Sequence, residues 1–468
     1  MDPNACKKPA KVFPSKSVIS KRPCSEQLSQ LRKRTQPSLN PRPIEDVIEE
    51  AQDVFSFGFN VGHTRFFSCV PSPASKVSCL GDAMTSLFNP FGGSLEAGTG
   101  VCTVEQSLIE WIAQLFGLPA SAGGHFVSGS SMATLTATIV ARDHILGECQ
   151  AERSKGVAYI SDQTHFSVPK ALRIIGIPPE NIRVIPSEAK FRMNSNKLGQ
   201  KILEDKQEGK IPFLVVGTCG TTGSGAIDPL HEIGEITRLH NIWFHVDAAY
   251  GGSVAFSSTH RSLVSGLSNA DSIAWDAHKW LFQTHGCGAV IFRDVTTALT
   301  SFSTPTTHFL VDIDKADSSP EVWNFGIELT RPARHMRLWF SLQVLGMKRI
   351  DQMISRGFHL SQLVEREIRK LHGWEIISPS TMGIVNFRFM PEGKPDTYLD
   401  IVNSQISKDL TDKNIALILT SRLTGVICLR MCTINPETTD EDIKDVVHAL
   451  DESAQLHCPT RGQIRSKL

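Results

Sequence analysis

Hydrophobic positions follow two different periods along the chain, and the change between them lies near residue 123. Residues 43–60 and 103–117 carry apolar side chains at i, i+3 and i+4, a spacing that predicts amphipathic helices. The glycine-rich residues 91–100 predict a loop between helical stretches. From residue 123 onward, short apolar runs alternate with helical patterns, which predicts an α/β fold with a mostly parallel sheet.

The same pattern divides the chain into regions. A long helical pattern begins near Arg331 and leads into a mixed region, so we expect a smaller α+β domain after the large one. The predicted regions are a disordered basic tail (1–42), an N-terminal helical segment (43–122), a large α/β domain (123–345), a small C-terminal domain (346–455) and a C-terminal tail (456–468).

The first forty residues are rich in lysine, arginine, serine and proline and contain few acidic residues. Such a composition buries little apolar surface and predicts disorder. A mitochondrial presequence is the alternative interpretation of the same composition.

Polar residues end or follow the predicted strands. His165 follows the predicted strand Val157–Ser161, and Thr222 follows the predicted strand 212–217. Asp247 is the last residue of the predicted strand Asn241–Asp247, and His278 and Lys279 follow Asp271–Asp276. In open parallel sheets the carboxyl ends of the strands meet at one edge, where ligands bind. The sequence therefore predicts one site that contains all of these residues.

Lys279 and Asp247 together indicate pyridoxal phosphate (PLP). Lys279 lies between an apolar run and Trp280, and an amine in apolar surroundings has a lowered pKa and forms a Schiff base more readily. A carboxylate such as Asp247 can keep a pyridine nitrogen protonated. Each residue alone has an ordinary alternative as a polar strand end, whereas the pair favours PLP chemistry.

Two further segments suit the same cofactor. Ser130 and Ser131 begin a predicted helix, whose free N–H groups and dipole favour a phosphate, although serine is also a common N-cap. His165 follows a strand, where its ring could stack on a planar cofactor; a purely structural histidine is the alternative. The hydroxyl of Thr222 could reach a cofactor oxygen.

The C-terminal half adds one candidate for substrate binding and one for a lid. Arg430 lies inside the predicted strand Val426–Cys432, where its two-donor fork suits a carboxylate, although an ordinary ion pair is the alternative. Residues 302–326 predict a long loop, and such loops often cover active sites.

Composition excludes several classes of protein. Lys+Arg and Asp+Glu are equal at 48 each, which gives no indication of a nucleic-acid or membrane partner. No apolar run reaches the length of a membrane span, and no secretory signal peptide is evident. The 11 cysteines form no CxxC pair, which indicates reduced intracellular thiols and neither a disulfide framework nor a metal site.

The chain ends in Ser466-Lys467-Leu468, the tripeptide that a peroxisomal import receptor recognises. We therefore expect the peroxisome as the location, with the cytoplasm as the alternative.

Five motifs together resemble the group II PLP-dependent amino-acid decarboxylases, which include the glutamate, cysteine sulfinate and aromatic-L-amino-acid enzymes. The motifs are His63-x-Arg-Phe-Phe67, Ser161-Asp-Gln-x-His165, Gly220-Thr-Thr222, His245-Val-Asp-Ala-Ala-Tyr250 and His278-Lys279. The resemblance covers residues 43–453. It implies PLP fold type I and a homodimer, with the segment 43–122 at the dimer interface.

The resemblance also implies a role for each candidate residue. Lys279 would carry the cofactor, Asp247 would pair with the pyridine nitrogen, and His165 would stack on the ring. The remaining implied contacts are those of Ser130, Ser131, Thr222 and Asp276 with the cofactor, and of Arg430 with the substrate carboxylate. The implied activity is decarboxylation of an L-amino acid to its amine and CO₂.

Three departures from the family pattern affect that expectation. Asp276 replaces the asparagine common two residues before the histidine-lysine pair, and a carboxylate is a poor neighbour for phosphate unless it is protonated or turned away. Cys69 replaces a glutamine of the glutamate enzymes, while Val70-Pro71-Ser72 resembles the aromatic enzymes and is the expected substrate contact. Residues 199–236 and 430–436, by contrast, resemble the glutamate and cysteine sulfinate branch. Aromatic substrates are preferred, with cysteine sulfinate or aspartate as alternatives.

The third departure is a missing tyrosine. Family decarboxylases carry a loop tyrosine that protonates the substrate, but residues 302–326 contain none. In related aldehyde synthases its loss allows reaction with O₂, giving aldehyde, ammonia and peroxide. The preferred interpretation is a decarboxylase with another proton donor, such as His165 or His278. An aldehyde synthase and a non-catalytic PLP-binding scaffold are the alternatives.

Overall fold

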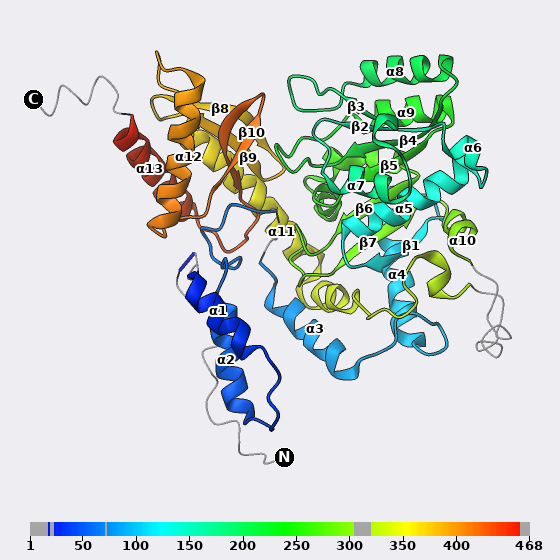
Figure 1. Ribbon diagram of the computed structural model, residues 1–468, viewed down its shortest axis with the longest axis horizontal. Helices are drawn as coiled ribbons and strands as arrows, with labels where there is room; N and C mark the ends of the chain where they lie inside the picture. Colours follow the sequence, from blue (N-terminus) through cyan, green and yellow to red (C-terminus); the bar gives the residue numbers. More distant parts are fainter. Residues whose placement is uncertain (1–16, 19–22, 71–72, 304–319, 459–468) are drawn as a thin grey trace, which may run out of the picture.

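The computed structural model describes residues 17–18, 23–70, 73–303 and 320–458 (Figure 1). The predicted substrate contacts Pro71 and Ser72, most of the predicted lid loop and the C-terminal tripeptide Ser466–Leu468 lie outside these ranges. Two sheets form the framework, a large one and a smaller one, and a long helix connects them (Figure 1). Within the described ranges, no helix is long and apolar enough to cross a membrane.

The large sheet has seven strands in the order β1-β7-β6-β5-β4-β2-β3. Strand β7 is antiparallel to both of its neighbours, and the others run parallel to one another. The prediction of an α/β fold with a mostly parallel sheet is confirmed. The strand bounds are β1 (Gly123–Val127), β2 (Gly156–Ser161), β3 (Ile182–Ile185), β4 (Ile211–Thr218), β5 (Trp243–Asp247), β6 (Ser272–Asp276) and β7 (Gly288–Phe292).

Helices cover both faces of this sheet, which is why its central strands are buried along their whole length. Successive side chains of β4 point to opposite faces: Val215 packs with one core cluster, while Leu214 and Val216 pack with the other. The first face is covered by α4 (Thr99–Leu115), α8 (Ser195–Gln207) and α9 (Leu230–His240). The second is covered by α5 (Ser130–Leu146), α7 (Ser167–Ile174) and α10 (Thr296–Phe302), and the short α6 (Gln150–Arg153) follows α5.

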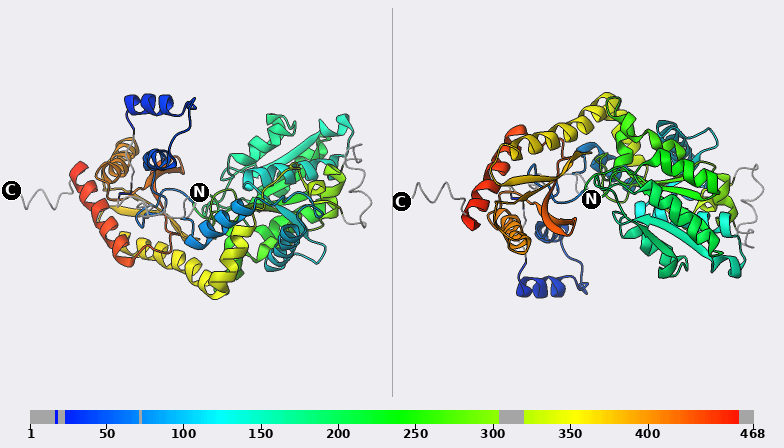
Figure 2. Two further views of the ribbon diagram at one scale, coloured as in Figure 1. Left: turned by 90° about the horizontal axis from the view of Figure 1, so that it is seen from below. Right: turned by 90° about the horizontal axis from the view of Figure 1, so that it is seen from above.

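Helix α11 (Met336–Ile368) connects the large sheet to the small domain (Figures 1 and 2). It bends at Gly346, whose φ of 67° lies in the left-handed region that glycine adopts without a Cβ clash. Beyond it, an antiparallel sheet has the order β10-β11-β9-β8, with bounds β8 (Trp374–Thr381), β9 (Ile384–Phe389), β10 (Leu419–Leu423) and β11 (Val426–Cys432).

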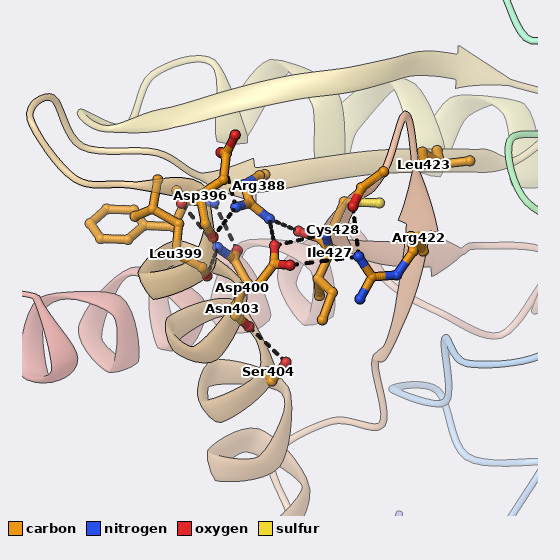
Figure 3. A network of polar contacts seen from close by, with 12 residues as sticks. Arg388, Asp396, Leu399, Asp400, Asn403, Ser404, Arg422, Leu423, Ile427 and Cys428 are labelled. Carbon is orange, nitrogen blue, oxygen red and sulfur yellow. Dashed lines mark hydrogen bonds and ion pairs between the residues drawn. The ribbon is translucent and has the colours of Figure 1, made fainter.

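The buried Arg388 joins the elements of the small domain (Figure 3). Its guanidinium on β9 lies 2.6 Å from Oδ1 of Asp400 on α12 (Asp396–Asp412) and also donates to the carbonyl of Ile427 on β11. Oδ1 of Asp400 in turn accepts the N–H of Ile427 at 2.9 Å. Arg388 and Asp400 therefore fix β11, the strand that carries Arg430, while α13 (Asp440–His457) packs on the same domain.

Helices α1 (Ser25–Arg34) and α2 (Ile44–Ser56) project from this framework, whereas α3 (Lys76–Phe88) packs on α11 (Figure 2). The predicted helix in 43–60 is present as α2 (Ile44–Ser56), and α3 (Lys76–Phe88) follows it. The prediction of a disordered tail over 1–42 is wrong for Ser25–Arg34, which form helix α1. A capping box formed by Cys24 and Gln27 starts this helix, and an ion pair between Arg34 and Asp53 of α2 stabilises its end.

Candidate active site

A cavity of about 610 Å³ lies at the carboxyl ends of the parallel strands, between the large sheet and the small domain. Every predicted site residue that the structure describes lines it: Val70, Ser130, Ser131, His165, Thr222, Asp247, Asp276, His278, Lys279 and Arg430. These residues come from β11, from the ends of β5 and β6, from the start of α5 and from the loops between elements. The parallel-sheet rule therefore brings residues from distant parts of the sequence to one place.

The N-terminus of α5 forms one end of the cavity. Gly129 precedes the helix, and Ser130 and Ser131 are its first residues. The Ser130 N–H donates a 2.7 Å hydrogen bond to Oδ1 of Asp276, and the Ser130 hydroxyl donates to Oδ2 of the same carboxylate. Free N–H groups at a helix N-terminus bind anions, and here an anionic side chain of the protein already accepts from one of them.

Asp247 and Lys279 lie at the ends of neighbouring strands in the middle of the cavity. Asp247 is 6% exposed, its Oδ1 accepts the N–H of Ala249 at 3.1 Å, and its burial raises its pKa while the nearby Lys279 opposes the rise. The Lys279 amine lies 3.2 Å from Oδ2 of Asp276. A buried carboxylate and an amine thus face the same space from β5 and from the turn after β6.

Hydrogen bonds assign the protons of the two site histidines. The Ser167 N–H donates to Nδ1 of His165 at 3.3 Å, so the neutral ring carries its proton on Nε2. In His278 the arrangement is reversed, because Nδ1 lies 3.1 Å from the carbonyl of Cys287, which can only accept. Burial lowers the pKa of both rings, which favours their neutral forms.

Arg430 forms the other end of the cavity. Its side chain is 8% exposed, and one nitrogen, Nη1, donates to the carbonyl of Ser68 at 2.8 Å. Its Nε and Nη2 have no hydrogen-bond partner among the described residues. A buried guanidinium with two unused donors is suited to a carboxylate ligand.

Sequence reasoning did not find several lining residues. Leu419 reaches the cavity because β10 pairs with β11, where it lies opposite Arg430. Ser68 was missed because its carbonyl, and not its side chain, orients that arginine. By contrast, the position of Ser167 two residues after His165 is a local signal that could have been used.

Comparison with known proteins decides the family. The model of the pyridoxal-dependent decarboxylase conserved domain matches residues 26–390. The chain belongs to this family. It is 34% identical to an aromatic-L-amino-acid decarboxylase of Bacillus atrophaeus over 87% of this chain and 85% of that protein. It is 31% identical to a phenylacetaldehyde synthase of Petunia hybrida over 75% of this chain and 71% of that protein.

Solved structures agree on the fold. Mouse CSAD superposes with a TM-score of 0.86 and 26% identity over 94% of each chain. Oryza sativa TDC with PLP and tryptamine superposes with a TM-score of 0.88 and 24% identity over 94% of this chain and 93% of that one. The chain is therefore a PLP-dependent carboxy-lyase of fold type I, and the family expectation from the sequence is confirmed.

The residues of the cavity fit PLP at three points and conflict with it at one. Lys279, the buried Asp247 and the start of α5 supply an amine, a carboxylate for the ring nitrogen and donors for a phosphate. Asp276 is the conflict, because its carboxylate accepts the hydrogen bonds of Ser130.

Proposed function

We propose that this chain decarboxylates an aromatic L-amino acid to the corresponding amine. The charges of the cavity carry this proposal. Apart from the two histidines, the basic lining residues that the structure describes are Lys279 and Arg430, and the acids are Asp247 and Asp276. If the cofactor and the α-carboxylate engage all four, no lining charge is left for an acidic or basic substrate side chain. The remaining lining includes Val70, Met132 and Leu419, together with Tyr250, which suit an apolar ring.

In this proposal each site residue has a defined task. Lys279 carries the cofactor, Asp247 keeps the ring nitrogen protonated, and His165 lies against the ring. Ser130 and Ser131 hold the phosphate, and Thr222 at the rim contacts the cofactor. Bound PLP supplies the electron sink that accepts the electrons of the broken Cα–carboxylate bond.

Arg430 positions the substrate. Its Nη1 is fixed by the carbonyl of Ser68, so Nε and Nη2 remain directed by the packing of β11 toward a single carboxylate. Burial excludes water from this contact and strengthens it. The guanidinium thus orients the group that leaves as CO₂.

His165 is the proposed proton donor in place of the family's loop tyrosine. Ser167 occupies its Nδ1, and the neutral ring therefore presents an Nε2–H. His278 is a weaker candidate, because its neutral ring holds its proton on Nδ1, against the carbonyl of Cys287. Replacement of His165 by asparagine should therefore slow product protonation more than the same change at His278.

A decarboxylating aldehyde synthase is the second candidate. It is favoured by the absence of tyrosine from residues 302–326 and by the similarity to the phenylacetaldehyde synthase. The two candidates differ in oxygen: the synthase consumes O₂ and releases ammonia and peroxide, whereas the decarboxylase consumes none.

The experiment is the simultaneous measurement of CO₂ release and O₂ uptake by PLP-loaded protein with a panel of L-amino acids. CO₂ from phenylalanine, tyrosine, tryptophan or dihydroxyphenylalanine without O₂ uptake supports the first proposal. CO₂ matched by O₂ and peroxide establishes the synthase instead. CO₂ only from cysteine sulfinate, aspartate or glutamate would overturn the assignment of an apolar side-chain pocket.

We further propose a homodimer that forms through the N-terminal helical segment. Large apolar side chains are exposed on α2 and α3, among them Phe55, Leu87 and Phe88, which are 80%, 77% and 74% exposed. Burial of such residues against a second copy would remove this surface from water. The double variant Leu87→Glu with Phe88→Glu should sediment as a monomer, and a dimer that persists would place the interface elsewhere.

The proposed location is the peroxisome, on the basis of Ser466-Lys467-Leu468 at the end of the sequence. A tagged chain should enter peroxisomes, and removal of these three residues should leave it in the cytoplasm. Equal distribution of both forms would contradict the proposal.

A further inference from the structure

Asp276 occupies the hydrogen-bond donors at the start of α5. Its two carboxylate oxygens accept from the N–H and the hydroxyl of Ser130. A phosphate at a helix N-terminus uses donors of this kind. The protein's own carboxylate and the cofactor's phosphate therefore require the same hydrogen bonds.

Contacts with its neighbours hold the Asp276 side chain in this position. It is 2% exposed, and two glycines border its Oδ1. A Cβ at Gly288 would come within 2.5 Å of this oxygen, and a Cβ at Gly129 would come within 3.6 Å. Lys279 and His278 lie 3.2 Å and 3.8 Å from Oδ2. Movement of the carboxylate out of this position would give up both hydrogen bonds from Ser130 and the contact with the Lys279 amine.

Protonation resolves the conflict without such movement. An ionised carboxylate only accepts hydrogen bonds, and so does a dianionic phosphate, so the two groups repel each other. A protonated carboxyl keeps its place and gains one O–H donor. We propose that Asp276 makes phosphate binding proton-linked: it takes up one proton from solvent when PLP binds and donates that proton in a hydrogen bond to a phosphate oxygen.

Five other titratable groups in the described part of the chain face Asp276, namely Lys279, His278, His165, Asp247 and Cys287. The amine of Lys279 lies 3.2 Å from Oδ2 of Asp276, and the buried Asp247 lines the same cavity. Burial lowers the pKa of His165 and His278 and raises that of the Cys287 thiol to about 12, so these three groups remain neutral near pH 7. Since binding takes up a proton, affinity for PLP falls as the pH rises, by up to about tenfold per unit.

The test compares PLP binding by the full chain and by Asp276→Asn between pH 6 and 8.5. Asparagine keeps the size of the side chain, removes its charge and supplies an N–H donor. Asp294→Asn is the matched control, because Asp294 is an exposed aspartate beyond β7 whose Oδ1 accepts the N–H of Thr296 at the start of α10, and an asparagine oxygen can accept the same hydrogen bond. Pyridoxal, which lacks the phosphate, is the control ligand. Calorimetry in two buffers of different ionisation enthalpy measures the protons taken up.

The dissociation constant for PLP should rise with pH in the natural chain and in Asp294→Asn. In Asp276→Asn the same dissociation constant should rise less steeply with pH. About one more proton should be taken up per PLP by the natural chain than by Asp276→Asn, and pyridoxal should show neither difference. Equal pH profiles, or equal proton uptake, would overturn the proposal. A difference that persists with pyridoxal would overturn it too, since Asp276 would then act on the ring or the amine.

Two safeguards keep the experiment decisive. The difference in proton uptake between PLP and pyridoxal needs no variant, because both ligands react with the amine through the same aldehyde and only PLP carries the phosphate. If Asp276→Asn fails to fold, a difference below half a proton in the natural chain still refutes the proposal. The inference depends on PLP as the cofactor and not on the proposed aromatic substrate. A natural chain without any PLP absorbance would overturn the cofactor itself, which is distinct from a PLP-bound chain without proton linkage.

Discussion

Replacement of Arg430 by methionine should impair substrate binding severely without destabilising the fold. The side chain is 8% exposed, and Nε and Nη2 find no partner within the described residues. Burial of a charge without compensation is unfavourable, so methionine of similar length should leave the free energy of unfolding unchanged or raise it. Function and stability should therefore respond in opposite directions.

The magnitude follows from the two donors. A hydrogen bond from a charged group contributes about 1.5–3 kcal/mol, so Nε and Nη2 together contribute about 3–6 kcal/mol to carboxylate binding. Since 1.4 kcal/mol corresponds to about a tenfold change, kcat/KM should fall at least about 100-fold in Arg430→Met. Arg430→Lys keeps the positive charge but loses the two-donor geometry of the guanidinium. Its kcat/KM should therefore lie between that of the natural chain and that of Arg430→Met.

The assay is steady-state kinetics together with inhibition by the amine product, which lacks the carboxylate. Affinity for the amine should not change in Arg430→Met, because the lost contact is absent from that ligand. Arg422→Met is the matched control on the adjacent strand β10, where the arginine is 61% exposed, and its kinetics should remain normal. A kcat/KM within threefold of the natural value, or an equal loss of affinity for the amine, would refute the assignment of Arg430.

The remaining predictions concern the cofactor, the small domain and acid stability. Lys279→Ala should abolish both cofactor absorbance and activity, and turnover by that variant would refute the role of Lys279. Arg388→Ala should lower the free energy of unfolding by about 2 kcal/mol or more in chemical denaturation, because its bonds to Asp400 and Ile427 are lost, whereas the exposed Arg422→Ala should change it by less than about 1 kcal/mol. His245 is buried, which lowers its pKa to about 3. The contribution of His245 to the free energy of unfolding is therefore complete above about pH 6.5 and decreases by about 1.4 kcal/mol per pH unit below it. In His245→Asn the free energy of unfolding should decrease less steeply between pH 6.5 and 5. An unchanged slope would show that this ring does not control acid stability.

The sheet and its ligand edge were predictable because they follow from local patterns. Asp247 and Asp276 end β5 and β6 where the apolar runs of the sequence end, and parallel strands then place both at one edge. The antiparallel direction of β7 had no such signal, since periodicity reports burial and not strand direction. Helix α1 was missed because its apolar positions bury nothing, and composition then outweighed its capping box.

Contacts between distant segments could not be predicted from the sequence. Leu419 reaches the cavity through its register opposite Arg430, and that register is a property of the assembled sheet. Asp276 was recognised as an unusual neighbour for a phosphate, but its acceptance of both Ser130 donors depends on packing between α5 and the end of β6. The glycines at 129 and 288 that permit this approach carry no sequence signal for it.

The two ends of the cavity carry opposite charges, Arg430 at one end and Asp276 at the other. We expect the substrate carboxylate to bind at the first and the cofactor phosphate at the second. Arg430 presents donors that a substrate carboxylate would complete, and guanidinium groups in proteins do not lose their charge. Asp276 presents an anion to donors that suit a phosphate, and its charge can be removed by one proton. Cofactor affinity should therefore depend on pH through Asp276, whereas the contribution of Arg430 to substrate affinity should not. If kcat/KM of the fully loaded enzyme falls equally in Arg430→Met at pH 6.5 and at pH 8, the two ends act independently; an unequal loss would show that protonation of the site is coupled to carboxylate binding.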